Sequence, residues 1–224
     1  MRWPDLTRPP WWPWPSLPRR LFRRFVFRRE VLVCLVRELD APVRRWRVPA
    51  GIVLRWLTAA DLDGLHPDLA PSRAAFADNF AAGLECHAAL ADGRVVAVCW
   101  FARDAAQDPK RQRFRFRCDE IYTFSLFVAP AYRGRALAAA VQTPAWSDLR
   151  ARDPEGRYRW LVRLVSLENE RALKLHRHMG FRPDGRGRYD FRLFHWRVTR
   201  AFAASAPPMR GAAERRIGAW EHGR

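Results

Sequence analysis

A hairpin pattern in the middle of the chain indicates which type of sheet this sequence forms. Residues 85–104 contain two apolar runs separated by Asp92-Gly93, and this dipeptide between apolar runs predicts a tight turn between antiparallel strands. Further apolar runs of strand length lie at 51–57 and 120–128. Because hairpin connections dominate here, we expect this part of the sheet to be mostly antiparallel.

The remaining segments add helices and further strands. Strands are predicted at 31–39, 158–167 and 189–199, and helices at 73–84, 134–152 and 169–179. Asn169 and Gly180 support the last helix, since asparagine caps helix N-termini and glycine suits the position just after a helix. This order predicts an α/β (α+β) chain with a mixed, mostly antiparallel sheet.

The composition is that of a folded and strongly basic chain. Hydrophobic residues make up 49% of the 224 residues, which is enough for a sizeable core. The 41 lysines and arginines outnumber 23 acidic residues, giving a net charge of +18, and only Lys110 and Lys174 are lysines. Such a charge favours anionic partners. Nucleic acid ranks low among them, because no RNP, zinc-finger or helix-turn-helix pattern is present.

The two ends differ from the middle of the chain. Residues 1–30 hold eight arginines against two acidic residues, together with four tryptophans and many prolines. Tryptophan with arginine suits an anionic membrane surface, and the alternative is a tail whose tryptophans pack on the domain. We expect a basic N-terminal extension at 1–49 with an extra strand, one domain at 50–200, and a disordered basic tail at 201–224.

Signals for export, membrane insertion and metal binding are missing from the sequence. The apolar run Val31–Val36 is far shorter than the roughly 18 residues of a membrane span. The four cysteines show neither a CxxC pair nor a Cys/His metal spacing, so no metal is expected. We therefore expect a cytoplasmic protein, with residues 1–30 as a means of peripheral attachment to the inner membrane surface.

A first chemical motif spans residues 128–138. A strand stops at Pro130, the chain turns through Arg133-Gly134-Arg135, and a helix of small residues follows. Such a turn leaves main-chain N–H groups free to bind an anion, small side chains let a phosphate approach, and the arginines add charge. Taken alone, an ordinary strand–turn–helix connection explains the pattern equally well.

A second motif at 167–181 makes a family recognisable. The pair resembles the GNAT (GCN5-related N-acetyltransferase) superfamily, with its V-x-P-x-Y and Q/R-x-x-G-x-G/A pattern followed by N-x-x-A-x-x-L-Y-x-x-x-G-F. The matching residues are Val128, Pro130, Tyr132, Arg133 and Ala138 in the first motif, and Asn169, Ala172, Leu175, Gly180 and Phe181 in the second. The resemblance covers about residues 50–200.

The resemblance implies a splayed sheet flanked by helices, with the pantetheine arm of acetyl-CoA or another acyl-CoA between two diverging strands. It implies that main-chain groups of Leu126, Phe127 and Val128 contact this arm and polarise the thioester carbonyl. The other cofactor-binding residues that it implies are Arg133, Gly134, Arg135, Ala136, Leu137, Ala138 and Asn169.

The catalytic positions depart from the family pattern. Ala136 stands where a glycine is usual, and His176 stands where many relatives keep the tyrosine that protonates the departing CoA thiolate. His176 could donate that proton near neutral pH, or it could merely pack there while water is the acid. Tyr122 occupies the place of a glutamate base found in some relatives. Glu120 shares its strand face and is either a base acting through water or a solvent-facing carboxylate.

The leading prediction is an N-acyltransferase. It would move an acetyl or other short acyl group from acyl-CoA to a small-molecule or peptide amine, by direct transfer in a ternary complex. The alternative is a catalytically degenerate CoA-binding domain that acts as a membrane- or polyanion-associated binding protein.

Overall fold

The computed structural model describes residues 27–44, 46–103, 116–193 and 196–202. Contacts divide them into two units. One unit contains residues 35–164 and 171–182, and the other contains the described parts of residues 1–34, 165–170 and 183–224. Residues 1–26 of the basic N-terminal arm and residues 203–224 of the predicted tail lie outside the described residues, whereas residues 27–30 belong to a strand at Phe27–Glu38 and residues 201–202 to a strand at Trp196–Phe202.

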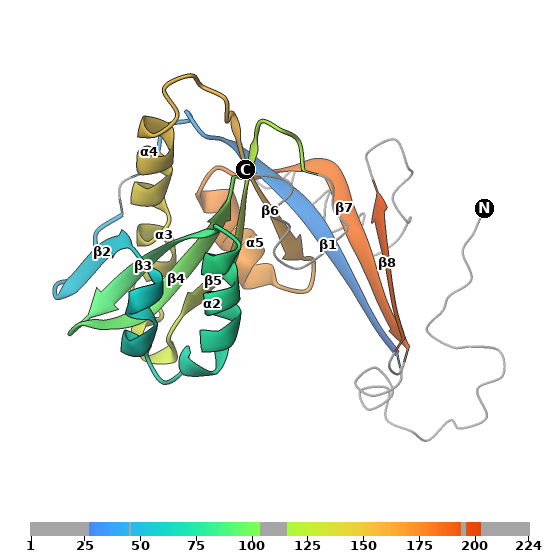
Figure 1. Ribbon diagram of the computed structural model, residues 1–224. Coiled ribbons are helices and arrows are strands. Elements are labelled where there is room, and N and C mark those ends of the chain that lie inside the picture. Colours follow the sequence, from blue (N-terminus) through green and yellow to red (C-terminus); the bar gives the residue numbers. More distant parts are fainter. Residues whose placement is uncertain (1–26, 45, 104–115, 194–195, 203–224) are drawn as a thin grey trace, which may run out of the picture. The chain divides into compact units, whose positions relative to one another are not determined.

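Within these residues, eight strands form a sheet in the order β2-β3-β4-β5-β6-β1-β7-β8 (Figure 1). Their bounds are Phe27–Glu38 (β1), Ile52–Trp56 (β2), Glu85–Ala91 (β3), Arg94–Ala102 (β4), Glu120–Val128 (β5), Trp160–Ser166 (β6), Arg182–Leu193 (β7) and Trp196–Phe202 (β8). Strands β2 to β5 pair antiparallel in sequence, β5 and β6 pair parallel, and β7 and β8 pair antiparallel. The predicted mixed, mostly antiparallel sheet is confirmed.

The central hairpin is built by the predicted turn. Ala91 pairs with Arg94, so the loop consists of Asp92 and Gly93 alone. Both have positive φ, 48° and 77°, which is the geometry of the two-residue turn whose twist matches that of the flanking strands.

The helices of the described residues are Ala59–Gly64 (η1), Ala70–Ser72 (η2), Arg73–Ala81 (α2), Pro130–Tyr132 (η4), Leu137–Ala140 (α3), Thr143–Ala151 (α4) and Glu170–His178 (α5).

The long helix predicted over 134–152 is wrong, because the chain forms the two shorter helices α3 and α4 there. Pro144 has no N–H to continue the ladder from α3. The ladder already changes at Gln142, whose main-chain N–H bonds to the Ala139 carbonyl while its side-chain amide donates to the Ala138 carbonyl at 2.6 Å.

The single late strand predicted over 189–199 is also wrong. The segment belongs to the antiparallel pair β7–β8, in which Leu193 lies opposite Trp196. The sequence between them is Phe-His, which contains none of the Gly, Asn or Asp residues that mark a two-residue turn. The reversal therefore carried no recognisable signal.

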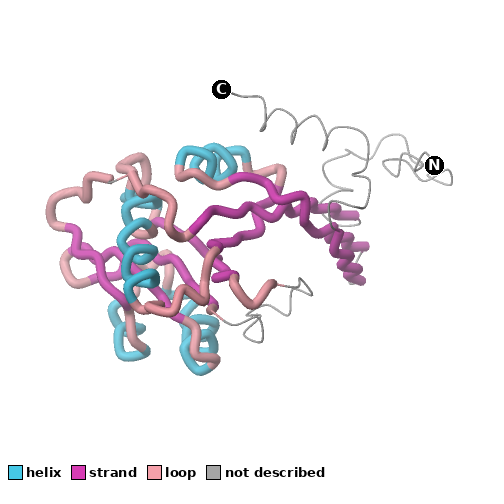
Figure 2. The backbone as a smooth tube through the Cα atoms, turned by 90° about the horizontal axis from the view of Figure 1, so that it is seen from above, coloured by secondary structure: helices cyan, strands magenta, loops and turns pink. Residues whose placement is uncertain are grey.

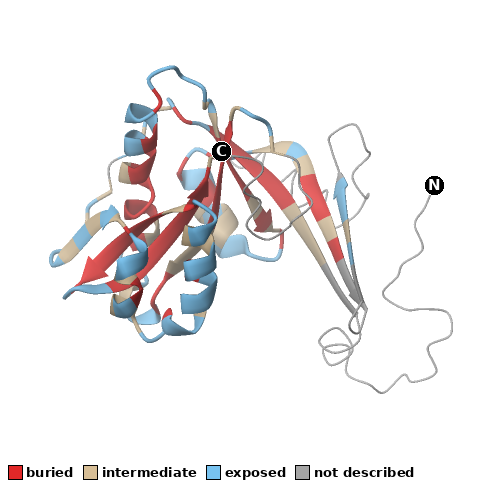
Figure 3. Ribbon diagram, viewed as in Figure 1, coloured by how far each residue is buried: buried red, intermediate tan, exposed pale blue. Residues whose placement is uncertain are grey.

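Helices cover both faces of the strands in the larger unit (Figure 2). Phe76 and Phe80 of α2 pack on Trp100 of β4, with ring centroids 5.2 and 4.9 Å apart. The next residue back along β4, Cys99, points to the opposite face because side chains alternate along a strand. That face is covered by α4 and α5, and the strands between the two helical layers are buried (Figure 3).

Arg37 at the end of β1 is buried, and its donors are well satisfied. Its guanidinium lies 4.8 Å from the centre of the Trp146 ring. Its hydrogen bonds, of 2.8–2.9 Å, go to the main-chain oxygens of Glu38, Ala41, Pro42 and Met179. One side chain thus joins β1, the segment that follows it and the end of α5.

We predict that Arg37→Met lowers the free energy of unfolding by about 3 kcal/mol, because it removes this donor from the buried Met179 carbonyl and from the partly buried carbonyls of Ala41 and Pro42. Urea unfolding of the variant and the wild type measures the difference. An unchanged unfolding midpoint would show that these carbonyl groups find other partners.

Candidate functional site

The parallel ladder between β5 and β6 stops early. It consists of the pairs Glu120–Trp160, Ile121–Leu161 and Tyr122–Val162. β5 nevertheless continues to Val128, so among the described residues its edge beyond Tyr122 has no hydrogen-bonded partner in β6. Leu126 and Phe127 on this edge are half-buried. The unpaired edge is the natural place for an extended ligand to bind main-chain groups.

A β-bulge interrupts β5 on this same stretch. Phe124 pairs with Trp100 and Phe127 with Val98, so β5 has one residue more than β4 between these two pairs. Ser125 adopts a left-handed φ of 48°. A bulge of this kind leaves one residue out of the ladder and re-aims its main-chain groups. This position overlaps the predicted segment Leu126, Phe127 and Val128.

The turn after β5 presents a run of free main-chain donors. In the described part of the chain, the N–H groups of residues 134–138 make no hydrogen bond, whereas those of Tyr132 and Arg133 bond to Ala129 and Pro130. Gly134 and Ala136 have left-handed φ values of 79° and 56°. Successive amides in such conformations form a concave site for an anion.

The structure shows the roles of Ala136 and Arg133 within the motif at 128–138. Ala136 occupies a left-handed position directly before α3, which costs an alanine about 1 kcal/mol and suits glycine. Arg133 is used partly inside the turn, since its Nε donates to the Val128 carbonyl at 3.0 Å. Arg135 is exposed and is free to meet a ligand.

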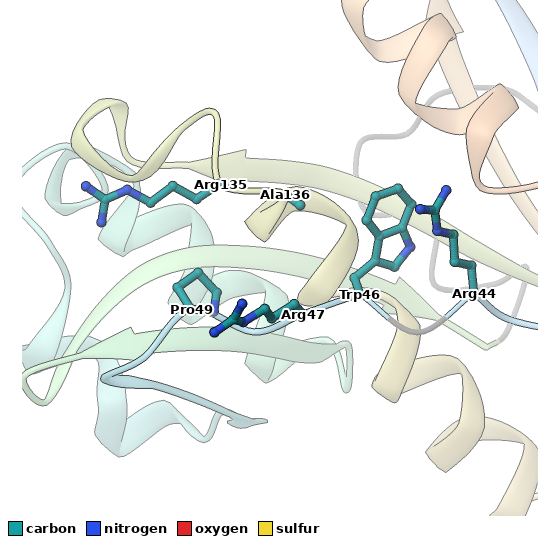
Figure 4. A pocket seen from close by; sticks show the side chains of 6 residues that line it. All are labelled: Arg44, Trp46, Arg47, Pro49, Arg135 and Ala136. Atoms are coloured by element: carbon teal, nitrogen blue, oxygen red, sulfur yellow. The ribbon is translucent and has the colours of Figure 1, made fainter.

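A positively charged pocket of about 460 Å³ adjoins the turn (Figure 4). It is lined by Arg44, Trp46, Arg47, Pro49, Arg135 and Ala136. Arg44 lies 4.9 Å from the centre of the Trp46 ring. The contribution of Arg44, Trp46, Arg47 and Pro49 was not predicted, because these residues fall in the predicted N-terminal extension. The dense run of arginine and tryptophan in this part of the sequence was the available signal.

Glu120 and Tyr122 do not meet His176. Both side chains are buried and lie on the sheet face covered by α2, with Tyr122 stacked on Phe124 at 5.3 Å. Glu120 accepts a hydrogen bond from the Arg117 main chain at 2.9 Å. It is therefore not the solvent-facing carboxylate of the alternative interpretation. Five steps of strand separate it from Ser125, or about 16 Å.

His176 lies on the opposite face, in contact with a buried arginine. The Nη1 atom of Arg163 is 2.9 Å from His176 Nδ1 and 2.6 Å from Nε2. Burial, and then the charge of Arg163, lower the pKa of His176 from 6.5 to about 2. The imidazole is uncharged at neutral pH, so it does not hold the proton that the predicted acid role requires. Packing and hydrogen bonding, the other interpretation, fit this environment.

The cap of α5 follows the second motif. Asn169 directly precedes the helix. At its end Gly180 has a φ of 82°, and the N–H groups of Gly180 and Phe181 bond to the carbonyls of Arg177 and His176. This pattern is the glycine-based helix ending that the sequence predicts.

Two features are absent from the described residues. No group of three or more His, Cys, Asp or Glu side chains is placed to hold a metal ion. No helix there is long and apolar enough to cross a membrane.

Comparison with protein families gives one match. The family model described as the acetyltransferase (GNAT) family matches residues 52–181, which is more than half of the chain. Comparison with curated protein sequences gave no match.

Solved structures share the fold. The tandem GNAT protein from the clavulanic acid biosynthesis pathway aligns with a TM-score of 0.54 and 16% identity over 83% of this chain. The alignment covers 61% of that protein, so the chain spans about three fifths of its length. A GCN5-related N-acetyltransferase from Sphaerobacter thermophilus aligns with a TM-score of 0.48 and 15% identity, over 78% of this chain and 55% of that one. At 16% identity, the likeness to the tandem GNAT protein shows the fold alone.

We predict that His176 makes the fold sensitive to acid. The unfolded chain binds a proton at His176 near pH 6.5, and the folded chain does so only near pH 2. Stability is therefore lost as the pH falls below about 6.5, by at most about 1.4 kcal/mol per pH unit from this group. Urea unfolding at pH 7.5 and 5 measures the loss.

The His176→Gln variant should lose less stability than the wild type between these two pH values. Burial also lowers the pKa of His87, so part of the acid sensitivity remains in the variant. An identical loss in both proteins would contradict the role given to His176.

Proposed function

Because the chain belongs to the acetyltransferase (GNAT) family, we propose that it transfers an acetyl or other short acyl group from acyl-CoA to an amine. The observation that carries this proposal is the run of free N–H groups at residues 134–138, beside a pocket lined by arginines. A diphosphate needs several donors that converge on its oxygens, and this turn supplies them from the main chain.

The residues present suit an acyl-CoA as co-substrate. The amides of residues 134–138 would take the pyrophosphate, and Arg44, Arg47 and Arg135 would add charge to the phosphates nearby. The edge of β5 at Leu126, Phe127 and Val128 would take the amide groups of the pantetheine arm. Asn169, at the start of α5, remains a proposed cofactor contact by its place in the second motif.

The chemistry needs few ionisable groups. The amine attacks the thioester carbonyl, a C–N bond forms, the C–S bond breaks, and the proton lost by the amine ends on water or on the thiolate. Main-chain donors at the Ser125 bulge would stabilise the developing oxyanion. Because His176 is uncharged, we assign the acid to water. Glu120 is too far along β5 to receive the proton through one water molecule.

The degenerate binding protein is the second candidate. The neutral state of His176 and the distance of Glu120 from the bulge favour it, because both proposed proton-transfer groups lack a suitable position or charge. A CoA-release assay over amines, amino acids, aminoglycosides, polyamines and peptides separates the two candidates. Release that depends on an amine supports the enzyme, and acetyl-CoA binding without release supports the binding protein.

We predict that charge reversal in the pocket weakens acetyl-CoA binding. Arg135→Glu and Arg47→Glu should each raise the Kd about tenfold or more, because each replaces a phosphate-facing cation by an anion. Added salt should also weaken the wild-type interaction. Isothermal titration calorimetry measures both effects.

The matched control is Arg157→Glu, which reverses an exposed charge just before β6, at the other end of the sheet from the turn. This control should bind as the wild type does. Equal affinities for all variants would remove the turn and its pocket from the binding site.

The N-terminal arm remains a proposed contact with an anionic membrane surface. Since β1 begins at Phe27, deletion of residues 1–26 removes the arm and keeps the strand. We predict that the deletion abolishes co-sedimentation with phosphatidylglycerol vesicles and leaves acetyl-CoA affinity unchanged. Vesicle binding that persists in the truncated protein would end this proposal.

A further inference from the structure

Arg163 on β6 is a buried cation without an anionic partner. Its side chain is 3% exposed. Its Nε donates to Thr123 Oγ1 at 2.9 Å, its Nη1 contacts His176, and its Nη2 has only the Cys99 sulfur, at 4.0 Å. No carboxylate among the described residues lies within ion-pair distance of it. Removing a guanidinium from water without a counter-charge is costly.

The neighbours of Arg163 stay neutral at physiological pH. Burial raises the pKa of the Cys99 thiol to about 11, and His176 is uncharged for the reasons given above. A thiol sulfur is a weak acceptor. At least one nitrogen of the guanidinium therefore lacks a strong hydrogen-bond acceptor.

Arg37 supplies an internal comparison. Both arginines are 3% exposed, and both lie in the same unit. Arg37 gives hydrogen bonds to four main-chain carbonyl groups, as a buried arginine with a purely structural role should. Arg163 instead has one hydroxyl, one imidazole and one thiol, and its guanidinium lies 5.6 Å from the centre of the Phe181 ring. The difference is that, among the described residues, Arg163 has no carbonyl or carboxylate acceptor for its charge.

The position of Arg163 in the sheet indicates which ligand could supply an anionic partner. It is the first residue of β6 beyond the last pair of the β5–β6 ladder, Tyr122–Val162. An acyl-CoA held by the turn after β5 would run along the free edge of β5 back toward that last pair. The acyl group is at the far end of the arm, so it comes nearest to Arg163 and Thr123.

We infer that Arg163 binds a substrate carboxylate at the closed end of the β5 edge, carried either by the acyl group or by the acceptor amine. Two nitrogens of one guanidinium can grip both carboxylate oxygens. The inference rests on the proposed function, and it adds a substrate class: a dicarboxylic acyl-CoA, or an amino acid as acceptor.

Calorimetry with the full-length protein tests both possible carriers of the carboxylate, the acyl group and the acceptor amine. For the acyl group, the affinities of acetyl-, propionyl-, malonyl- and succinyl-CoA are compared. For the acceptor, β-alanine and propylamine are titrated into protein saturated with CoA. We expect the carboxylate-bearing member of one series to bind about tenfold tighter or more than its neutral counterpart.

Variants test whether Arg163 causes this preference for carboxylate-bearing ligands. Arg163→Met should abolish it, Arg163→Lys should keep part of it, and Arg37→Met, which also removes a buried arginine, should keep it in full. Free CoA should bind the wild type and Arg163→Met equally.

The outcomes separate this inference from the proposed function. If free CoA binds but neither series shows a preference for the carboxylate, the wild type alone overturns the inference, even if the variants fail to fold. If free CoA does not bind, the proposed function fails first. A preference that survives Arg163→Met assigns the carboxylate to another residue and also overturns the inference.

Discussion

Three residue pairs hold β5 to β6, and the point at which this ladder stops decides what the rest of the site can be. Up to Tyr122 this edge of β5 is paired with β6, and beyond Tyr122 it has no partner in β6 among the described residues. The bulge at Ser125 and the turn at 134–138 both follow this point along the chain. Along the chain the end of the ladder, the bulge and the turn therefore follow one another in this order, and Arg163 is the first residue of β6 beyond the last pair.

The fold was readable where local chemistry alone determines it. Asp92-Gly93 and Gly180 each need a left-handed backbone that glycine tolerates, or that aspartate adopts in a tight turn, and each lies where the sequence pattern predicts. The break at Pro144 and the reversal between β7 and β8 were not predicted. The small residues around Pro144 are typical of one long helix, and the Phe-His sequence between the two strands carries no turn signal.

The candidate site also has a part that the sequence predicts and a part that it does not. Main-chain donors after Tyr132 follow from a contiguous motif, so the turn was foreseen. The pocket needs Arg44 and Arg47, which lie about 90 residues earlier in the chain than Arg135, and no periodicity relates them. Burial of His176 against Arg163 depends on how α5 packs on β6. A sequence motif names the residue type at such a position but not its protonation state.

The pocket beside the turn is lined by arginines and contains no lysine. Acyl thioesters modify free amines without any enzyme, and a lysine there would lose its charge each time this happened. A guanidinium keeps its proton at every physiological pH and does not offer a nucleophilic lone pair. In the proposed complex, the cations of this pocket would therefore be chemically inert toward the acyl donor that they help to bind.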